Sequence, residues 1–416
     1  MKNIFISNIK IENVRHLKNI IIPLSKEKCK HLIVTGKNGS GKTSVLQAIA
    51  NYLNGAITSN SLQEAQELLI FYQNKVKELK KAGLENNERL KVEKAMEEYI
   101  AKVEEIKSGL CIEINEPTDT LCYHFEKGNF VLAYYKAERT FQADIPKHVE
   151  KVNLQETYKI DDSPRQQFVK YLVDIKMTEA LAQIDGEDEK AGEIKNWFTK
   201  FQDLLRKIFD DASLELVFER DTFSFFIKEK NREKFDFNSL SSGFAAVLDI
   251  VLDLIMRMEK STNRSFNFNI PGIVLIDEIE THLHLELQKT ILELLTTIFP
   301  NVQFIVSTHS PFVVNSLENV VIYDLENNTL VEKGLVDVPY NGIVEGYFQV
   351  DEMSTRLKEK YEKYKSLVKK EELTDDDFEE IAKLELFLDE IPDYLALNIT
   401  TEYQRLKMEL ESREDI

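Results

Sequence analysis

The segment GKNGSGKTS, at positions 36–44, constrains the fold more than any other feature of this chain. It has the spacing GxxxxGK[ST], in which glycines let a loop curl around phosphate oxygens. The apolar run KHLIVTG precedes it, and the amphipathic stretch KTSVLQAIANYL follows it. A buried strand, a glycine-rich loop and a helix in this order predict an α/β fold that binds a nucleoside triphosphate. A plain glycine-rich strand-to-helix turn is the alternative.

The loop predicts both the cofactors and the residues that hold them. ATP and Mg²⁺ are the expected cofactors, since a lysine at the seventh place of the motif reaches the β- and γ-phosphates and the next hydroxyl ligates the ion. Lys42 is therefore a candidate catalytic residue, and Thr43 is a candidate Mg²⁺ ligand. The residues expected to contact ATP are Gly36, Asn38, Gly39, Ser40, Gly41, Lys42, Thr43 and Ser44.

Two later apolar runs are each followed by residues suited to hydrolysis. In IVLIDEIE, Asp277 is expected to hold Mg²⁺ through water, and Glu278 to polarise the attacking water. In FIVSTHSP, His309 is expected to contact the γ-phosphate. Asp277 and Glu278 could instead form an acidic helix N-cap, and His309 could be a structural residue.

A serine-rich turn, LSSGF at positions 240–244, lies between these motifs and begins an apolar helix. Taken alone it predicts an ordinary N-cap. A helix N-terminus also attracts anions, so Ser241, Ser242 and Gly243 form a candidate second phosphate contact.

The order of motifs resembles the ABC-type ATPases of the AAA family, in their chromosome-maintenance, RecF-like and OLD-like branch. The resemblance implies a P-loop NTPase head with an antiparallel β subdomain. It also implies that LSSGF of one subunit completes the ATP site of another, in a dimer or a higher even-numbered oligomer. LSSGF replaces the family's LSGGQ, so Ser242 and Phe244 stand where the family has Gly and Gln.

The resemblance suggests two further elements. Gln142 is a candidate for the family's Q-loop residue, near Mg²⁺. The neighbouring Glu138 and Arg139 recur in OLD-like ATPases, where Arg139 would be either a phosphate contact or a structural ion-pair partner. The segment ETHLHLE, positions 280–286, resembles the D-loop, which touches the partner subunit.

Heptad spacing and charge predict the domain organisation. An ATPase domain at 1–345 is interrupted by a helical hairpin at 58–109, and a charged α-helical region follows at 346–416. The hairpin is expected either to project as a coiled coil or to pack on the body. Its apolar seam is made of Leu62, Ala65, Leu69, Tyr72, Val76, Leu79, Val92, Met96, Tyr99, Val103 and Ile106. TLCYHFEKGNFVLAYY is expected to form antiparallel strands, and LELVFERDTFSFFIKEK a β-hairpin.

Composition and charge restrict the expected partners and cellular location. The formal net charge of −19 gives a poor overall field for nucleic acid, although a local basic patch would suffice. The three cysteines form no CxxC pair, no signal peptide begins the chain, and no apolar run approaches the roughly 20 residues of a membrane span. A cytoplasmic protein without a membrane partner is expected.

The helical insertion and tail resemble the ATPase subunits of anti-phage defence systems of the PARIS or Septu type. Such a protein would control a separate nuclease, of HNH or TOPRIM type, after a DNA or phage-protein trigger. A DNA repair or chromosome-maintenance ATPase that clamps DNA is the alternative. A scaffold that only binds ATP is disfavoured because Lys42, Asp277 and Glu278 are all present.

Overall fold

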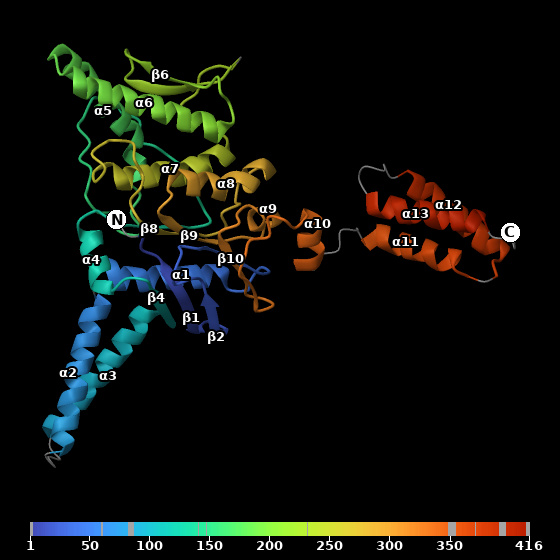
Figure 1. The fold of residues 1–416 in the computed structure, drawn as a ribbon, viewed down its shortest axis with the longest axis horizontal. Coiled ribbons are helices and arrows are strands. Elements are labelled where there is room, and N and C mark those ends of the chain that lie inside the picture. Colours follow the sequence, from blue (N-terminus) through green and yellow to red (C-terminus); the bar gives the residue numbers. More distant parts are fainter. Residues whose placement is uncertain are drawn as a thin grey trace. The chain divides into compact units, whose positions relative to one another are not determined.

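The buried apolar runs of the chain form one six-stranded sheet (Figure 1). Neighbouring strands are parallel from β10 to β5, and only β11 is antiparallel. The five parallel strands are buried at every position, which explains why they lack polar alternation. In sheet order the strands are β11 (Thr329–Val331), β10 (Val320–Asp324), β3 (His31–Thr35), β9 (Val302–Ser307), β8 (Gly272–Ile276) and β5 (Val131–Tyr135).

This computed structural model describes residues 3–59, 61–81, 87–139, 141–146, 148–230, 232–347, 355–370, 372–390 and 397–412. The chain divides into two units, Met1–Tyr340 and Asn341–Ile416. The division falls shortly before the boundary expected at 345. Each unit has its own apolar core.

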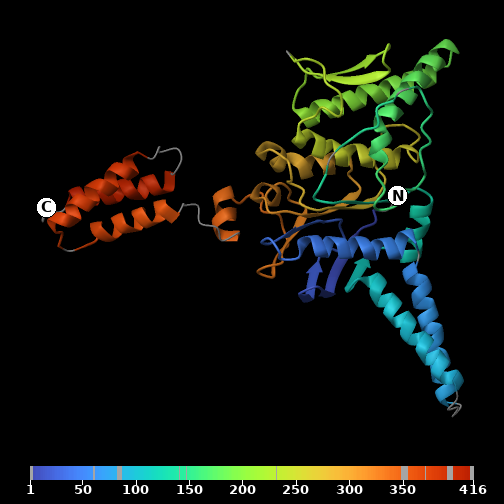
Figure 2. The same ribbon diagram turned by 180° about the vertical axis from the view of Figure 1, so that it is seen from behind.

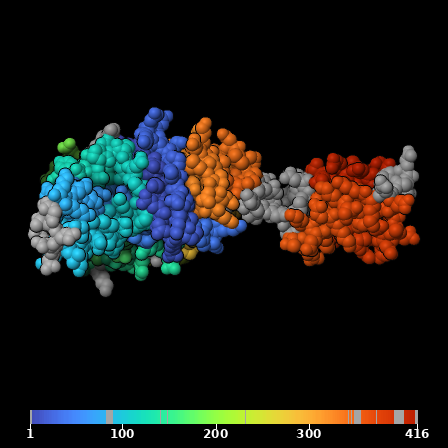
Figure 3. All heavy atoms as spheres, turned by 90° about the horizontal axis from the view of Figure 1, so that it is seen from below, coloured from blue at the N-terminus to red at the C-terminus, as the bar shows by residue number. Residues whose placement is uncertain are grey.

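Helices cover both faces of the large sheet. On one face, α1 (Lys42–Leu53) lies between this sheet and a second, antiparallel sheet of order β2-β1-β4 (Figure 1). On the other face lie α7 (Ser242–Glu259) and α8 (Leu285–Ile298). From below, the antiparallel strands (blue) lie between the insertion helices and the β10–β11 region in orange (Figure 3). The antiparallel strands are β1 (Ile6–Val14), β2 (Leu17–Pro23) and β4 (Leu110–Ile114).

The expected antiparallel pairing of TLCYHFEKGNFVLAYY is wrong. Its first part is a helix, α4 (Thr118–Glu126), because its buried residues Leu121, Cys122 and Phe125 have helical rather than alternating spacing. Its last part is β5, which pairs in parallel with β8. The hairpin expected at LELVFERDTFSFFIKEK is confirmed as β6 (Glu215–Glu219) and β7 (Ser224–Lys228).

The insertion consists of α2 (Ser61–Lys81) and α3 (Asn87–Lys107), which pack on each other and extend away from the sheets (Figures 1 and 2). Leu62, Ala65 and Val103 join the main core at the base, and the rings of Tyr72 and Tyr99 stack further out. The helices are expected to be joined by a turn at KAGLENNE, positions 81–88, of which residues 82–86 lie outside the described residues.

Further helices complete the first unit. Two of them, α5 (Phe168–Ile184) and α6 (Asp188–Phe209), lie beyond α7 on the outer side of the molecule (Figure 1). The short ones are the π-helix Asn54–Thr58, the 3-10 helix Pro164–Gln167 and α9 (Pro311–Val314). Among the described residues, no helix has the length and apolarity needed to cross a bilayer.

The second unit is built from charged helices around a small core. Tyr364 is fully buried there and donates a hydrogen bond to Glu385. Thr374 and Asp377 form a capping box at the start of the helix Asp375–Asp389. The helices are α10 (Tyr340–Gly342), at the boundary, the π-helix Ile343–Tyr347, α11 (Thr355–Val368), α12 (Asp375–Asp389) and α13 (Leu397–Glu411).

Candidate active site

Three adjacent strands deliver the predicted site residues to one edge of the sheet. β3 leads to the P-loop, β8 to Asp277 and Glu278, and β9 to His309. Because the strands are parallel, their carboxyl ends meet at the same edge, where ligands of α/β sheets bind. A cavity of about 210 Å³ lies there, lined by Arg15, His16, Asn38, Gly39, Gly41, Lys42, Thr43, Ser44, Glu278 and His309.

The P-loop has a shape that requires glycine. Gly36 has a φ of 133°, and a Cβ there would lie 2.7 Å from the Oγ of Ser40. Gly41 has a φ of 101° and begins α1 without any side-chain cap. The first N–H groups of α1 are thus available to an anion. The Ser40 Oγ is buried without a hydrogen-bond partner among the described residues, and Ser40 is not among those that line the cavity.

Lys42 is folded back into this loop. Its Nζ donates hydrogen bonds to the carbonyl oxygens of Gly36, at 2.8 Å, and Lys37, at 3.1 Å. Burial lowers the pKa of Lys42, while the carboxylates of Glu278, Glu280, Asp277 and Asp324 oppose that change. A partly dehydrated ammonium surrounded by carboxylates is suited to receive a more strongly anionic ligand.

The Asp-Glu pair forms a tight turn fastened to β9. The hydroxyl of Ser307 donates to the carboxylate of Asp277, and its oxygen accepts the main-chain N–H of Glu278 at 2.8 Å. Asp277 is 2% exposed, and Glu278 is half-buried and lines the cavity. Glu278 has a φ of 46°, a left-handed conformation that is uncommon for residues other than glycine.

His309 lines the cavity and is half-buried. Its main-chain N–H donates to the carboxylate of Glu280 at 2.6 Å. Burial lowers the pKa of the imidazole, and the charge of Lys42 adds to this, although Glu280, Glu278 and Asp277 oppose it. The ring is therefore mostly neutral at pH 7 and gains charge only in acid.

The LSSGF segment at 240–244, which we call the signature turn, lies outside this cavity. Ser241 and Ser242 are exposed at the start of α7, where no side chain caps the helix. Neither they nor Gly243 are among the described residues that line the cavity. Gly243 packs on the D-loop-like segment, where a Cβ would lie 3.1 Å from the carbonyl oxygen of His282. One chain thus holds the P-loop cavity and the signature turn as separate features.

Phe244, which stands in place of the family's Gln, has a packing role. Its ring stacks on that of Phe209 with a centroid separation of 4.2 Å and an interplanar angle of 16°. This contact ties the first turn of α7 to the end of α6.

The candidates after β5 are placed differently from the expectations. Gln142 and Glu138 are exposed, and neither is among the described residues that line the cavity. Arg139 is buried, and its guanidinium donates hydrogen bonds to main-chain carbonyl oxygens, two of which belong to Asp277 and Glu278. The phosphate contact and the ion pair considered for Arg139 from the sequence remain predictions.

Sequence reasoning missed Arg15 and His16, which line the cavity from the turn between β1 and β2. The sequence signal was the Asn-x-Arg turn, Asn13 to Arg15, although nothing local to it indicates how close it comes to the P-loop. The contact depends on α1 packing between the two sheets: a Cβ at Gly41 would lie 3.0 Å from the side chain of Leu17.

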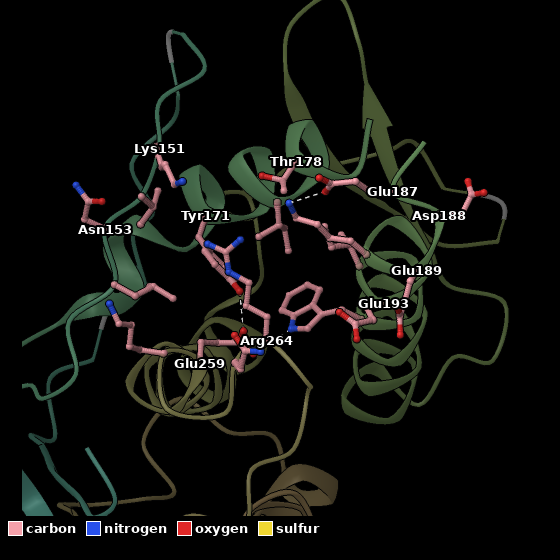
Figure 4. A pocket seen from close by; sticks show the side chains of 18 of the residues that line it. Lys151, Asn153, Tyr171, Thr178, Glu187, Asp188, Glu189, Glu193, Glu259 and Arg264 are labelled. Carbon is pink, nitrogen blue, oxygen red and sulfur yellow. Dashed lines mark hydrogen bonds and ion pairs between the residues drawn. The ribbon is translucent and has the colours of Figure 1, made fainter. Parts of the chain in front are cut away.

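A larger cavity, of about 1140 Å³, lies between α5, α6 and the end of α7 (Figure 4). Glu259 is buried at its base and accepts hydrogen bonds from the Tyr171 hydroxyl, at 2.6 Å, and the Trp197 indole, at 2.9 Å. No predicted site residue is among the described residues that line it. Its buried carboxylate is already paired, which is typical of a structural network.

Comparison with known proteins agrees with these motifs. A family model described as "AAA ATPase domain" matches residues 4–178, and one described as "AAA domain, putative AbiEii toxin, Type IV TA system" matches residues 128–315. The first range holds the P-loop, and the second holds the signature, the Asp-Glu pair and His309.

Two curated relatives match parts of the chain. "Septu protein PtuA" of Bacillus mycoides strain KBAB4 is 26% identical over 78% of this chain and 41% of that protein. "Retron Ec83 probable ATPase" of Escherichia coli is 34% identical over 36% of this chain and 29% of that protein. The chain thus spans less than half the length of either relative.

Among solved structures, this chain is similar to the Smc head domain with an extended coiled coil, bound to the C-terminal domain of ScpA, from Pyrococcus furiosus. It is 16% identical, with a TM-score of 0.38, over 83% of this chain and 99% of that one. The two family matches together span residues 4–315. Residues 4–178 and 128–315 are thus each similar to domains of the AAA family, and together these two stretches hold the P-loop, LSSGF, the Asp-Glu pair and His309.

Proposed function

We propose that this chain binds and hydrolyses ATP at the cavity beside the P-loop. The observation that carries the proposal is the convergence of Lys42, Glu278 and His309 on one cavity from three adjacent strands. The glycine-dependent loop and the uncapped start of α1 fit a polyphosphate.

Each side chain has a role in this proposal. Lys42 would leave the loop carbonyls for the β- and γ-phosphates, and Glu278 would accept a proton from the attacking water. Neutral His309 would donate or accept a hydrogen bond at the γ-phosphate. Thr43 and Asp277 would hold Mg²⁺, which would offset the charge of the phosphates.

We place the other half of each site on a second copy of the chain. The exposed Ser241 and Ser242 begin α7, which lies on the sheet face opposite α1 (Figure 1). The N-terminus of α7 would meet the γ-phosphate held by the partner's P-loop, giving a dimer or a higher even-numbered oligomer.

Complementation tests this arrangement. Lys42→Ala removes one half of the site and Ser241→Arg removes the other, so each variant alone should be inactive. An equimolar mixture should recover about a quarter of the wild-type rate, because half the dimers are mixed and each has one intact site. No recovery, after mixed dimers have been demonstrated, would contradict the shared site.

Glu278→Gln tests hydrolysis itself. The variant should bind ATP, accumulate as the closed dimer and hydrolyse at least about 100-fold more slowly than the wild type. Nucleotide binding, gel filtration and phosphate release measure the three properties. A wild-type rate in this variant would remove Glu278 from its role.

The relatives named Septu protein PtuA and retron ATPase support a role in anti-phage defence. We propose that the nucleotide state of the ATPase head controls a separate nuclease of HNH or TOPRIM type, through the insertion or the C-terminal unit. Expression of the chain with the nuclease encoded beside it should reduce phage plaques, and Glu278→Gln should abolish or lock the response. A neighbouring nuclease that neither co-purifies with the chain nor affects plaques would contradict this role.

A further inference from the structure

Arg139 lies directly behind the turn that carries the proposed catalytic carboxylate. It follows β5, the sheet neighbour of β8, and is 4% exposed. Its guanidinium donates to the carbonyl oxygens of Asp277 at 2.6 Å, Glu278 at 2.9 Å and Ile279 at 3.3 Å, and to that of Lys136 at 3.1 Å. Three successive carbonyl groups therefore converge on one side chain.

That convergence results from the left-handed conformation of Glu278. A φ of 46° at a non-glycine residue persists only where the surroundings stabilise it. The opposite side of the turn is held by Ser307, which accepts the N–H of Glu278 at its Oγ and that of Ile279 at its carbonyl oxygen. Arg139 and Ser307 thus hold the turn from two sides.

The charge of Arg139 is also maintained. Burial lowers the pKa of its guanidinium, while four carboxylates, those of Asp249, Glu280, Asp277 and Glu278, oppose the change. Arginine stays protonated in proteins, and its planar fork can bond several acceptors in fixed directions. A lysine would keep the charge but could not present that fork.

We propose that Arg139 is a positioning residue for hydrolysis: it holds the main chain at Asp277–Ile279 so that the Glu278 carboxylate faces the P-loop cavity. The role rests on the proposed ATPase function, since Arg139 acts through Glu278 and is not among the described residues that line the cavity. Loss of the fork would let the turn relax, and a misplaced general base slows chemistry more than it weakens binding.

Arg257 provides a matched control on α7. It is also 4% exposed, and its guanidinium donates to the carbonyl oxygens of Leu132 at 3.0 Å and Lys159 at 2.9 Å, and to the carboxylate of Asp253 at 2.7 Å. Among the described residues, the Arg257 guanidinium makes no hydrogen bond to the Asp277–Ile279 turn. Substitution of either arginine breaks buried hydrogen bonds, but only one set of bonds belongs to the turn.

The experiment compares Arg139→Lys with Arg257→Lys in the full chain, by thermal unfolding, ATP affinity and single-turnover hydrolysis. Arg139→Lys should lower the hydrolysis rate about tenfold or more and change the ATP dissociation constant by less than about threefold. Arg257→Lys should lower the Tm comparably but keep the rate within about twofold. Arg139→Gln replaces Arg139→Lys if the lysine variant does not fold.

A double-mutant cycle completes the test. If Arg139 acts only through Glu278, adding Arg139→Lys to Glu278→Gln should leave the residual rate unchanged within about twofold. Additive losses, an unchanged rate in Arg139→Lys, or equal rate losses in both arginine variants would overturn the inference. A wild-type chain that binds ATP without hydrolysing it would instead refute the proposed function.

Discussion

Ser307 offers a direct test of how the Asp-Glu turn is held. Its side chain is fully buried at the end of β9, where the hydroxyl donates to Asp277 and the oxygen accepts the N–H of Glu278. Ser307→Ala removes both hydrogen bonds with a change of one atom. Alanine has no acceptor, so the buried N–H of Glu278 is left without its partner.

The expected loss of stability follows from these two bonds. A hydrogen bond to a charged group contributes about 1.5–3 kcal/mol, and a buried donor left unpaired costs about 1–3 kcal/mol, so a total of about 2.5–6 kcal/mol is expected. Unfolding entropy of ~2.1 cal/mol/K per residue, applied to the first unit, converts this loss into a Tm decrease of about 4–8 °C. We also expect the hydrolysis rate to fall about tenfold, because the turn is released on one side.

Thermal unfolding and phosphate release measure the two effects, with Gln303→Leu as the control. Gln303 lies on the same strand, is fully buried, and pairs through its amide with Ile6 and Lys30, away from the cavity. Gln303→Leu should lower the Tm but leave the hydrolysis rate per folded molecule unchanged. A Ser307→Ala protein with wild-type Tm and rate would refute the reasoning.

Two further predictions concern the loop and the sheet. Gly36→Ala should abolish ATP binding in calorimetric titration, because a Cβ there would lie 2.7 Å from the Oγ of Ser40. Gly39→Ala, which also has a positive φ but no neighbour within 4 Å, should retain measurable binding, and equal affinities would contradict this. Burial lowers the pKa of His31 to about 4, so the unfolded state takes up the proton first. Its contribution to the unfolding free energy should therefore decline as the pH falls from about 6.5 to 4, by about 2 kcal/mol at pH 5, and this part should vanish in His31→Gln.

The fold was predictable where the signal was local. A P-loop is one continuous segment, and continuous apolar runs identified β3, β8 and β9 without knowledge of their neighbours. The failure at TLCYHFEKGNFVLAYY has a physical cause. Short apolar runs fit a strand or a helix equally well, and the pairing of β5 with β8 joins segments far apart in sequence.

The sequence by itself determined the candidate residues for phosphate and Mg²⁺ binding and for hydrolysis. They are Lys42, Asp277, Glu278 and His309, which follow buried strands in a recognisable order. Only the tertiary structure decided which of these share a cavity, because the order β3-β9-β8 is set by long-range pairing. It alone placed Arg139 behind the Asp277–Ile279 turn. Every residue has a main-chain carbonyl oxygen, so a hydrogen bond to that atom cannot be read from the residue's identity.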